Sequence, residues 1–167
     1  MSTGRILVVD DEEAIRSTLE DYFVANGYDV VTAGDGEDAI EKFSPGDFDC
    51  IISDLMMPRI NGLDLLKKIR PLDKDVLFLM MTAYPGIDSA IDAMNQGAYD
   101  FVTKPFHMED LRMKVERILN AKKTEESLKT KKNLLWWLII SIPSCFILGI
   151  ILGRVWKERG CSYTCRR

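Results

Sequence analysis

Short apolar runs alternate with helix-period segments five times within the first 120 residues. The expected strands cover residues 5–9, 28–33, 49–53, 76–81 and 99–102, and the expected helices cover 13–26, 37–43, 63–69, 87–96 and 108–120. The apolar runs are too short and too continuous for exposed helices, which favours buried strands. Because crossovers between parallel strands are right-handed, this order predicts a parallel sheet with helices on both faces. Ligands of such sheets bind beyond the carboxyl ends of the strands.

Charge is divided unevenly along the chain. Residues 1–120 carry 12 basic and 23 acidic side chains, a net charge of −11, whereas residues 121–167 carry 10 and 3, a net charge of +7. The acidic part argues against nucleic acid as a direct partner, because phosphate binding needs clustered lysine and arginine. Apolar residues make up 47% of the chain, which excludes global disorder. We therefore expect one globular domain followed by an appendage.

The appendage contains a run of membrane length. Residues 134–153 include no charged side chain, and at 1.5 Å per residue this run is about 30 Å long, the thickness of the bilayer core. Trp136 and Trp137 lie near one end and Trp156 just beyond the other, like interfacial anchors. The alternative is a buried core helix, but we find no other part of the chain to bury it. The expected divisions are a domain over residues 4–121, a charged linker or helix extension over 122–133, a transmembrane helix over 134–156 and a short basic tail over 157–167.

Polar side chains follow four of the five expected strands. They are Asp10 and Asp11 after the first, Asp54 after the third, Thr82 after the fourth and Lys104 after the fifth. Three carboxylates in one place repel one another, so they either hold protons or recruit a hard divalent cation such as Mg²⁺. Lys104 adds a positive charge and Thr82 a hydroxyl donor, a set that suits a phosphoryl group. A carboxylate can be the nucleophile for phosphoryl transfer when cations neutralise the incoming group.

Each of these residues also has a simpler interpretation. The two adjacent aspartates could cap the following helix. Asp54 could be a turn residue, Thr82 a β-branched residue that closes a strand, and Lys104 a solvated loop lysine. Their joint placement at the ends of the expected strands favours a common site over these separate roles.

Four motifs resemble the receiver domain of two-component response regulators. They are ILVVDDE (6–12), ISDLMMPRINGLDLL (52–66), MTAY (81–84) and GAYDFVTKPF (97–106). The resemblance covers about residues 4–121. It implies a flavodoxin-like, doubly wound, five-stranded parallel sheet and a phosphoacceptor switch that is not an enzyme in its own right.

The resemblance also assigns roles in the acceptor site. Asp54 would be the phosphoacceptor, supplied by a sensor histidine kinase or a phosphotransfer protein. Asp11, Asp54 and the backbone carbonyl of Met56 would bind Mg²⁺ or Mn²⁺, with Asp10 acting largely through a bound water. Lys104 would contact the phosphoryl oxygens.

Further roles concern the response to phosphorylation. By the resemblance, the peptide bond between Lys104 and Pro105 would be cis, a geometry that X-Pro bonds readily permit. Thr82 would move to bind the phosphoryl group, and Phe101 takes the place of the aromatic switch residue. Because Phe101 lacks a hydroxyl, only the burial of its ring could report phosphorylation.

Two neighbouring side chains bear on the lifetime of the acyl phosphate. Met56 and Tyr84 would flank the phosphoryl group where water must approach, and we hypothesise that they slow hydrolysis; simple packing is the alternative. His107 is expected to open the last helix rather than to relay phosphoryl groups. The chain would therefore accept phosphoryl groups and not supply them.

Three classes of function remain open. The first is a switch whose face around residues 82–106 binds an unknown downstream protein. The second is a phosphoryl sink or relay intermediate, since we recognise no DNA-binding or ATPase output module. The third is an aspartyl-phosphate phosphatase, which is disfavoured because Met56 stands where a second acid would be needed.

The expected cellular location of the protein is inferred from its C-terminal tail and from the resemblance. Five basic residues precede the apolar run and five follow it, so charge does not orient the helix. No signal peptide precedes the domain, so we expect the receiver in the cytoplasm and the protein at the bacterial inner membrane, where it could act as a tethered adaptor. Of the four cysteines only Cys50 lies within the domain, while Cys161 and Cys165 could pair if exported, or be free thiols or lipidation sites if not.

Overall fold

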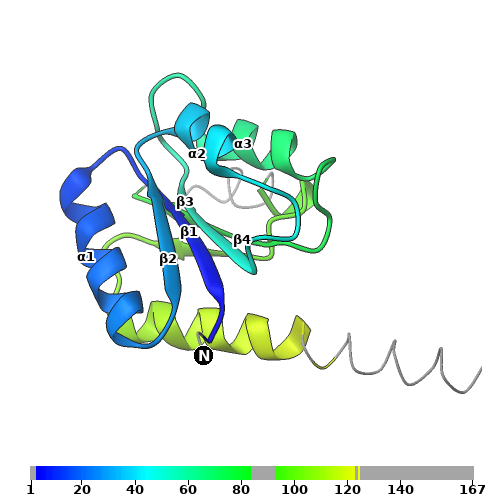
Figure 1. Cartoon of the computed structure of the whole chain (residues 1–167). Helices are drawn as coiled ribbons and strands as arrows, with labels where there is room; N and C mark the ends of the chain where they lie inside the picture. The colour runs from blue at the N-terminus through cyan, green and yellow to red at the C-terminus, as the bar shows by residue number, and fades with distance from the viewer. Residues whose placement is uncertain (1–2, 84–92, 123, 125–167) are drawn as a thin grey trace, which may run out of the picture. The chain divides into compact units, whose positions relative to one another are not determined.

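A single parallel sheet organises the domain. The structure is a computed structural model that describes residues 3–83, 93–122 and 124, and the first of its two compact units is Met1–Ala121. In this unit, five strands lie in the order β2-β1-β3-β4-β5 (Figure 1). The elements are β1 (Arg5–Val9), α1 (Glu13–Ala25), β2 (Asp29–Ala33), α2 (Gly36–Lys42), β3 (Cys50–Asp54), α3 (Gly62–Ile69), β4 (Leu77–Thr82) and β5 (Asp100–Thr103), with further helical residues at 93–95 and 108–122.

All four strand pairings are parallel, as the alternation of strands and helices predicts. β1 pairs with both β2 and β3, so the order of strands reverses direction at β1. In open α/β sheets this reversal opens a crevice beyond the carboxyl ends of the strands. The predicted flavodoxin-like, five-stranded fold is confirmed.

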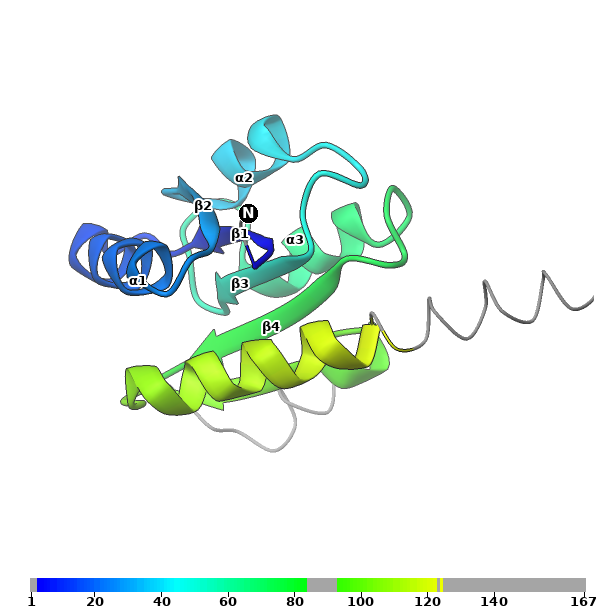
Figure 2. The same ribbon diagram turned by 60° about the horizontal axis from the view of Figure 1, so that its bottom comes forward.

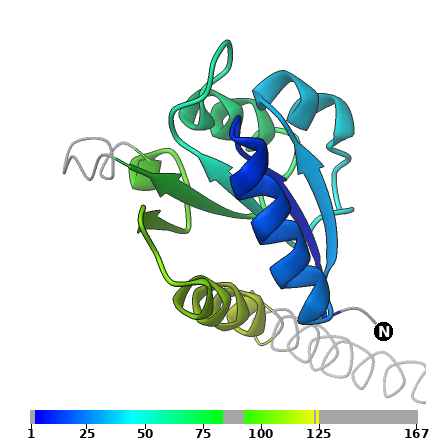
Figure 3. The ribbon, with the colours of Figure 1, turned by 90° about the vertical axis from the view of Figure 1, so that its left-hand side faces the viewer.

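Alternate residues of each strand enter two separate cores. Leu7, Ile51 and Phe78 pack with α2 and α3 on one face. Ile6, Ile52 and Leu79 pack on the other face with α1 and with the helix over residues 108–122. Figures 2 and 3 show these two layers of helices on opposite sides of the sheet. Both faces are buried, which explains why the strands read as continuous apolar runs.

The ends of the elements differ slightly from the sequence prediction. β3 ends at Asp54 and β4 at Thr82, one residue later than expected, because main-chain pairing does not depend on the polarity of the side chain. Tyr28 was expected to open β2, but its N–H donates to the carbonyl of Phe23 and so completes the end of α1. Gly27 follows α1 with φ +87°, the left-handed conformation expected there.

Part of the prediction falls outside the described residues. The expected helix over 87–96 is described only from residue 93, where it is helical. The predicted transmembrane helix over 134–156 and the tail over 157–167 lie wholly outside, as does the linker except for Lys122 and Thr124. Within the part of the chain that is described, no helix combines the length and apolar character needed to cross a bilayer.

Gly62 lets α3 begin directly against the end of β3. Its N–H donates to the carbonyl of Leu55 at 3.0 Å. A Cβ atom at this position would lie 2.2 Å from the carbonyl oxygen of Asp54 and 2.8 Å from the sulfur of Met80. No side chain fits there without displacing the backbone of Asp54.

We expect Gly62→Ala to lower the free energy of unfolding by about 2 kcal/mol, because the added methyl group overpacks a site bounded by backbone. The measurement is urea unfolding of residues 1–121 followed by circular dichroism. Gly34→Ala is the control, since its Cβ would meet only Arg16 side-chain atoms at 3.9 Å or more. Equal midpoints for the two variants would show that the close approach at Gly62 is unimportant.

Candidate functional site

The parallel register brings the predicted site residues to one edge of the sheet. Val9 pairs with Ser53, and Thr82 pairs with Thr103, so all the strands involved end at a similar level. Asp10 and Lys104 are the next residues after β1 and β5, and Asp54 and Thr82 are the last residues of β3 and β4. These four side chains come from four strands and meet at the crevice.

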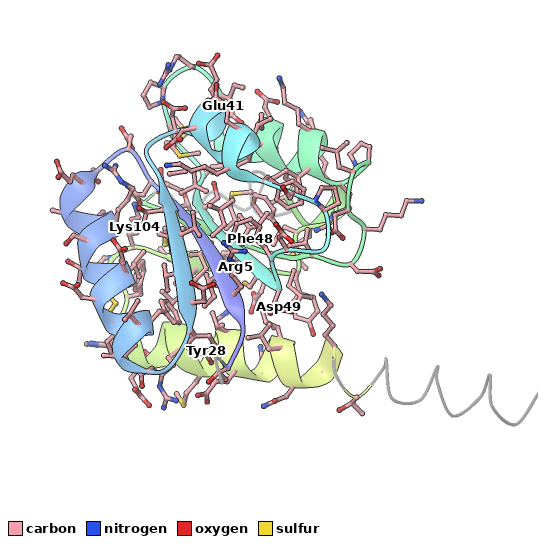
Figure 4. The ribbon with its side chains drawn as sticks, in the orientation of Figure 1. Arg5, Tyr28, Glu41, Phe48, Asp49 and Lys104 are labelled. Atoms are coloured by element: carbon pink, nitrogen blue, oxygen red, sulfur yellow. The ribbon has the colours of Figure 1, made fainter. Side chains whose placement is uncertain are left out.

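Lys104 joins two buried carboxylates. Its Nζ lies 2.7 Å from Oδ2 of Asp10 and 2.8 Å from Oδ1 of Asp54. Asp10 is fully buried, and Asp54 is 6% exposed. In Figure 4 Lys104 lies beside α1, apart from Arg5, Phe48 and Asp49. The ammonium group therefore provides much of the charge compensation that two buried anions require.

The environment of Lys104 keeps it charged. Burial lowers the pKa of its ammonium group, but hydrogen bonds and charge interactions with Asp10 and Asp54 outweigh this effect, and the pKa is raised above its usual value. A lysine whose pKa is higher in the folded than in the unfolded chain stabilises the fold fully below about pH 10. That contribution is lost only as the pH rises through the raised pKa.

Asp54 is held at a defined orientation by its own loop. The N–H of Met56 donates to Oδ2 at 2.8 Å, while Oδ1 faces Lys104. The N–H of Leu55 continues the ladder by donating to the carbonyl of Met81 at 2.8 Å. Gly62 packs against the carbonyl of Asp54 from the other side. The carboxylate thus presents a fixed oxygen pair at the edge of the sheet.

The expected convergence of three carboxylates is only partly met. Asp10 and Asp54 converge on Lys104, but the side chain of Asp11 is exposed. Among the residues that the structure describes, no three Asp, Glu, His or Cys side chains form a group that could hold a metal ion. The physical reason is that a lysine already lies between the two buried carboxylates and balances their charge.

The donor atoms that the resemblance assigns are of the kind that Mg²⁺ takes. They are hard oxygens, namely the carboxylates of Asp11 and Asp54 and the carbonyl of Met56. Mg²⁺ characteristically takes only one or two protein carboxylates and keeps several waters, so two carboxylates and one carbonyl match its chemistry. The exposure of Asp11 leaves room for those waters.

Thr82 and Phe101 lie where the sequence places them. Thr82 is 5% exposed, and its carbonyl accepts the N–H of Lys104 at 2.7 Å. Phe101 is partly buried against the core beneath α2 and α3. The peptide bond between Lys104 and Pro105 is cis, as the resemblance implies. Tyr84, the second predicted lifetime residue, lies outside the described residues.

His107 precedes the last helix, as predicted. Its carbonyl accepts the N–H of Leu111 at 3.2 Å, which places it at the start of the helix over residues 108–122. Its side chain is exposed. This is the position of a residue that opens a helix.

The sequence analysis missed Arg16. Its Nη1 donates to the carbonyl of Asp10 at 2.6 Å, so it contacts the acidic loop directly. A possible signal was an arginine five residues after Asp11 in a helix that begins beside the site. Spacing alone could not separate this role from that of a solvated helix residue.

An apolar groove adjoins Lys104. Its volume is about 540 Å³, and it is lined by Ala14, Ile15, Thr18, Ala83, Lys104, Pro105, Phe106 and Met108. The groove therefore lies between the start of α1 and the loop that follows β5. A protein that reaches Asp54 from this side would meet an apolar surface.

Comparisons with known proteins agree with this geometry. Residues 6–116 match the family model for the response regulator receiver domain. The chain is 35% identical over 122 residues to the response regulator MprA of Mycobacterium ulcerans, covering 73% of this chain and 53% of MprA. It is 32% identical over 126 residues to the regulatory protein AtoC of Escherichia coli, covering 75% of this chain and 27% of AtoC. The chain thus spans about half the length of the first relative and about a quarter of the second.

A solved structure shares the fold at similar identity. The non-phosphorylated HemR receiver domain from Leptospira biflexa superposes with a TM-score of 0.67 and is 33% identical. The match covers 70% of this chain and 94% of the HemR domain. The match therefore takes in nearly the whole HemR domain and only part of this chain.

We expect Lys104→Met to lower the free energy of unfolding by roughly 3 kcal/mol, because it leaves two buried carboxylates without their cation. Lys67→Met is the matched control, since Lys67 and Asp64 form an ion pair in which both side chains are about half exposed. Its loss should change stability by less than about 1 kcal/mol. Chemical unfolding of both variants at neutral pH is the measurement, and a Lys104 variant as stable as the control would contradict the bridging role.

Proposed function

The chain belongs to the response regulator receiver family, and on that premise we propose that it is a phosphoacceptor switch in which Asp54 takes a phosphoryl group from a sensor histidine kinase or a phosphotransfer protein. One observation carries the proposal. The carboxylate of Asp54 lies at the edge of the sheet with one oxygen bound to a lysine ammonium and the other to a backbone N–H. This arrangement combines a nucleophile with a fixed cation.

The transfer forms an acyl phosphate. A carboxylate oxygen of Asp54 attacks phosphorus in line, and the P–N bond to the donor histidine breaks as the new P–O bond forms. The electron pair of the broken bond stays with the imidazole. Lys104 then contacts phosphoryl oxygens instead of the Asp54 carboxylate oxygen to which it is bound in the unmodified chain.

The proposed cation adds to the charge that Lys104 provides. A Mg²⁺ or Mn²⁺ ion held by Asp11, Asp54 and the carbonyl of Met56, with Asp10 acting through a bound water, would neutralise charge on the phosphoryl oxygens. Lys104 keeps Asp10 and Asp54 in place by direct contact at 2.7 and 2.8 Å. Each donor would phosphorylate the chain once, and self-catalysed hydrolysis of the acyl phosphate would restore the free carboxylate. The chain would therefore act as a switch rather than as an enzyme.

Thr82 and Phe101 would transmit the change. Because the carbonyl of Thr82 accepts the N–H of Lys104, the ends of β4 and β5 are coupled through the backbone. A shift of Thr82 toward the phosphoryl group would move the following loop inward. Phe101, packed partly in the core, would respond by changing the burial of its ring.

Met56 would limit access of water to the acyl phosphate. Its side chain is 65% exposed, two residues after the acceptor. A thioether chain at this point would cover the approach to Asp54 without offering a hydrogen bond that orients water. With Tyr84, it would slow hydrolysis.

The partners are proteins. A net charge of −11 over residues 1–120 supports this assignment and disfavours nucleic acid. The apolar groove beside Lys104 offers a surface on which a phosphodonor could seat its helix. The downstream protein would recognise the face around residues 82–106.

We expect the full-length chain to gain one phosphoryl group from acetyl phosphate with Mg²⁺, and Asp54→Asn to gain none. Removal of the divalent cation with EDTA should abolish the gain. The measurement is intact mass spectrometry. Asp64→Asn, which changes a half-exposed aspartate in the helix that follows the acceptor loop, should be phosphorylated like the wild type. Phosphorylation of the Asp54 variant would contradict the proposal.

The tail would tether this switch to a membrane. The support is the uncharged run over residues 134–153, flanked by tryptophans and by five basic residues on each side. Basic flanks suit anionic lipid head groups. The switch would then act as a membrane-tethered adaptor, with Asp54 in the cytoplasm.

We expect the full-length chain to sediment with the bacterial membrane fraction and to be released only by detergent. A chain that ends at residue 121 should remain in the supernatant, because it lacks the apolar run. Immunoblotting of the fractions is the measurement. A full-length chain that is soluble after lysis without detergent would overturn the tether and leave the phosphoacceptor proposal intact.

A further inference from the structure

Asp10 is held through each of its polar groups. Its N–H donates to the carbonyl of Ala33 at 3.3 Å. Its Oδ1 accepts the N–H of Glu12 at 3.0 Å, and its Oδ2 accepts Nζ of Lys104 at 2.7 Å. Its carbonyl oxygen accepts Nη1 of Arg16 at 2.6 Å. The first three contacts fix the carboxylate and the end of β1, whereas the fourth fixes the peptide unit that leads to Asp11.

The orientation of that peptide unit decides where Asp11 points. Among the residues that the structure describes, no hydrogen bond or ion pair holds the exposed carboxylate of Asp11. Its direction therefore depends on its backbone. A rotation of the peptide between Asp10 and Asp11 would change the direction of the Asp11 carboxylate, and the hydrogen bond from Arg16 opposes this rotation.

Arg16 also reaches the loop between β2 and α2. A Cβ atom at Gly34 would lie 3.9 Å from Cζ and from Nη1 of Arg16, so the guanidinium lies near this glycine. The N–H of Gly34 donates to Oδ2 of Asp38 at 3.0 Å, and Lys42 donates to the same oxygen at 2.9 Å. The guanidinium of Arg16 therefore binds the Asp10 carbonyl and lies close to the loop between β2 and α2.

The charge of Arg16 is balanced on both sides. Burial raises the pKa of the Asp38 carboxyl. Hydrogen bonds from Lys42 and Gly34 and the charges of Lys42 and Arg16 together outweigh this effect. The pKa is therefore lowered overall, and the carboxyl remains ionised. On the other side, residues 10–13 are four consecutive acids. A cation fixed between these acidic groups offsets the repulsion that would otherwise spread the loop.

We infer that Arg16 is a positioning residue for the acidic loop: by holding the carbonyl of Asp10, it sets the direction of the Asp11 carboxylate toward the cation that phosphorylation requires. Arg16 acts through Asp10 and Asp11, and it touches neither the acceptor nor the phosphoryl group. The inference rests on the proposed phosphoacceptor function, and its test is a binding measurement that needs no phosphodonor.

The experiment is calorimetric titration of Mg²⁺ into the full-length chain in neutral detergent. Arg16→Gln should weaken Mg²⁺ binding by about tenfold or more, the effect typical of removing a group that orients a metal ligand. In phosphorylation by acetyl phosphate, the Mg²⁺ concentration for half-maximal rate should rise by a similar factor. The rate at saturating Mg²⁺ should fall less. Arg16→Lys should bind Mg²⁺ with intermediate affinity, because an ammonium group can still donate to the Asp10 carbonyl but lacks the planar fork that fixes the direction of a guanidinium bond.

Arg70→Gln is the matched control. Arg70 also holds backbone carbonyls, those of Lys74, Val76 and Gly97, but at the opposite edge of the sheet. This variant should lose stability and keep its Mg²⁺ affinity. The same residue change therefore separates a loss of fold from a loss of ligand positioning.

Several outcomes would overturn the inference. One is an Mg²⁺ affinity of Arg16→Gln equal to that of the wild type, and another is an equal loss of affinity in both glutamine variants. If Arg16→Gln does not fold, an Arg16→Lys variant with wild-type affinity has the same consequence. A wild-type chain that binds Mg²⁺ but never accepts a phosphoryl group would instead defeat the proposed function, so the two failures can be told apart.

Discussion

The salt bridge from one ammonium group to two buried carboxylates is the interaction on which the rest of the site depends. Asp10 and Asp54 come from neighbouring strands, and both are almost completely withdrawn from water. Two such anions repel each other, and each also loses hydration, so they require a cation in the fold itself. Lys104 meets this need from a third strand end. In the proposed function the same cation would be available to a phosphoryl group, because a carboxylate oxygen of Asp54 that carries phosphorus loses its negative charge.

Backbone contacts hold this charged group in place. The end of β3 is fixed by Met56, whose N–H binds Asp54, and by Gly62, which allows α3 to begin in contact with the same residue. The end of β1 is fixed by Arg16, which binds the carbonyl of Asp10. The end of β4 is tied to Lys104 through the carbonyl of Thr82. In the described part of the chain, these contacts connect the ends of β1, β3, β4 and β5 to one another or to the loops that follow them.

The two parts of the chain differ in the sign of their net charge. Residues 1–120 carry the excess of acids, and two of these, Asp10 and Asp54, contact Lys104 at the carboxyl end of the sheet. In the proposed function, this acidic part would attract a divalent cation that offsets the repulsion of a phosphoryl group. Residues 121–167 carry the excess of basic side chains around an uncharged run, the composition on which the proposed membrane tether rests. Under these proposals the opposite signs would serve different partners, a metal ion in the first case and lipid head groups in the second.

The sequence by itself determined the alternation of strands and helices, the parallel sheet and the arrival of Asp10, Asp54, Thr82 and Lys104 at one edge. These follow from periodicity and from the handedness of crossovers, which are local or nearly local constraints. Only the tertiary structure decided that Lys104 lies between two carboxylates while Asp11 stays exposed, and that Arg16 donates a hydrogen bond to the carbonyl of Asp10. Such contacts depend on where side chains from distant segments end once the sheet is twisted and packed, and sequence spacing does not encode those distances.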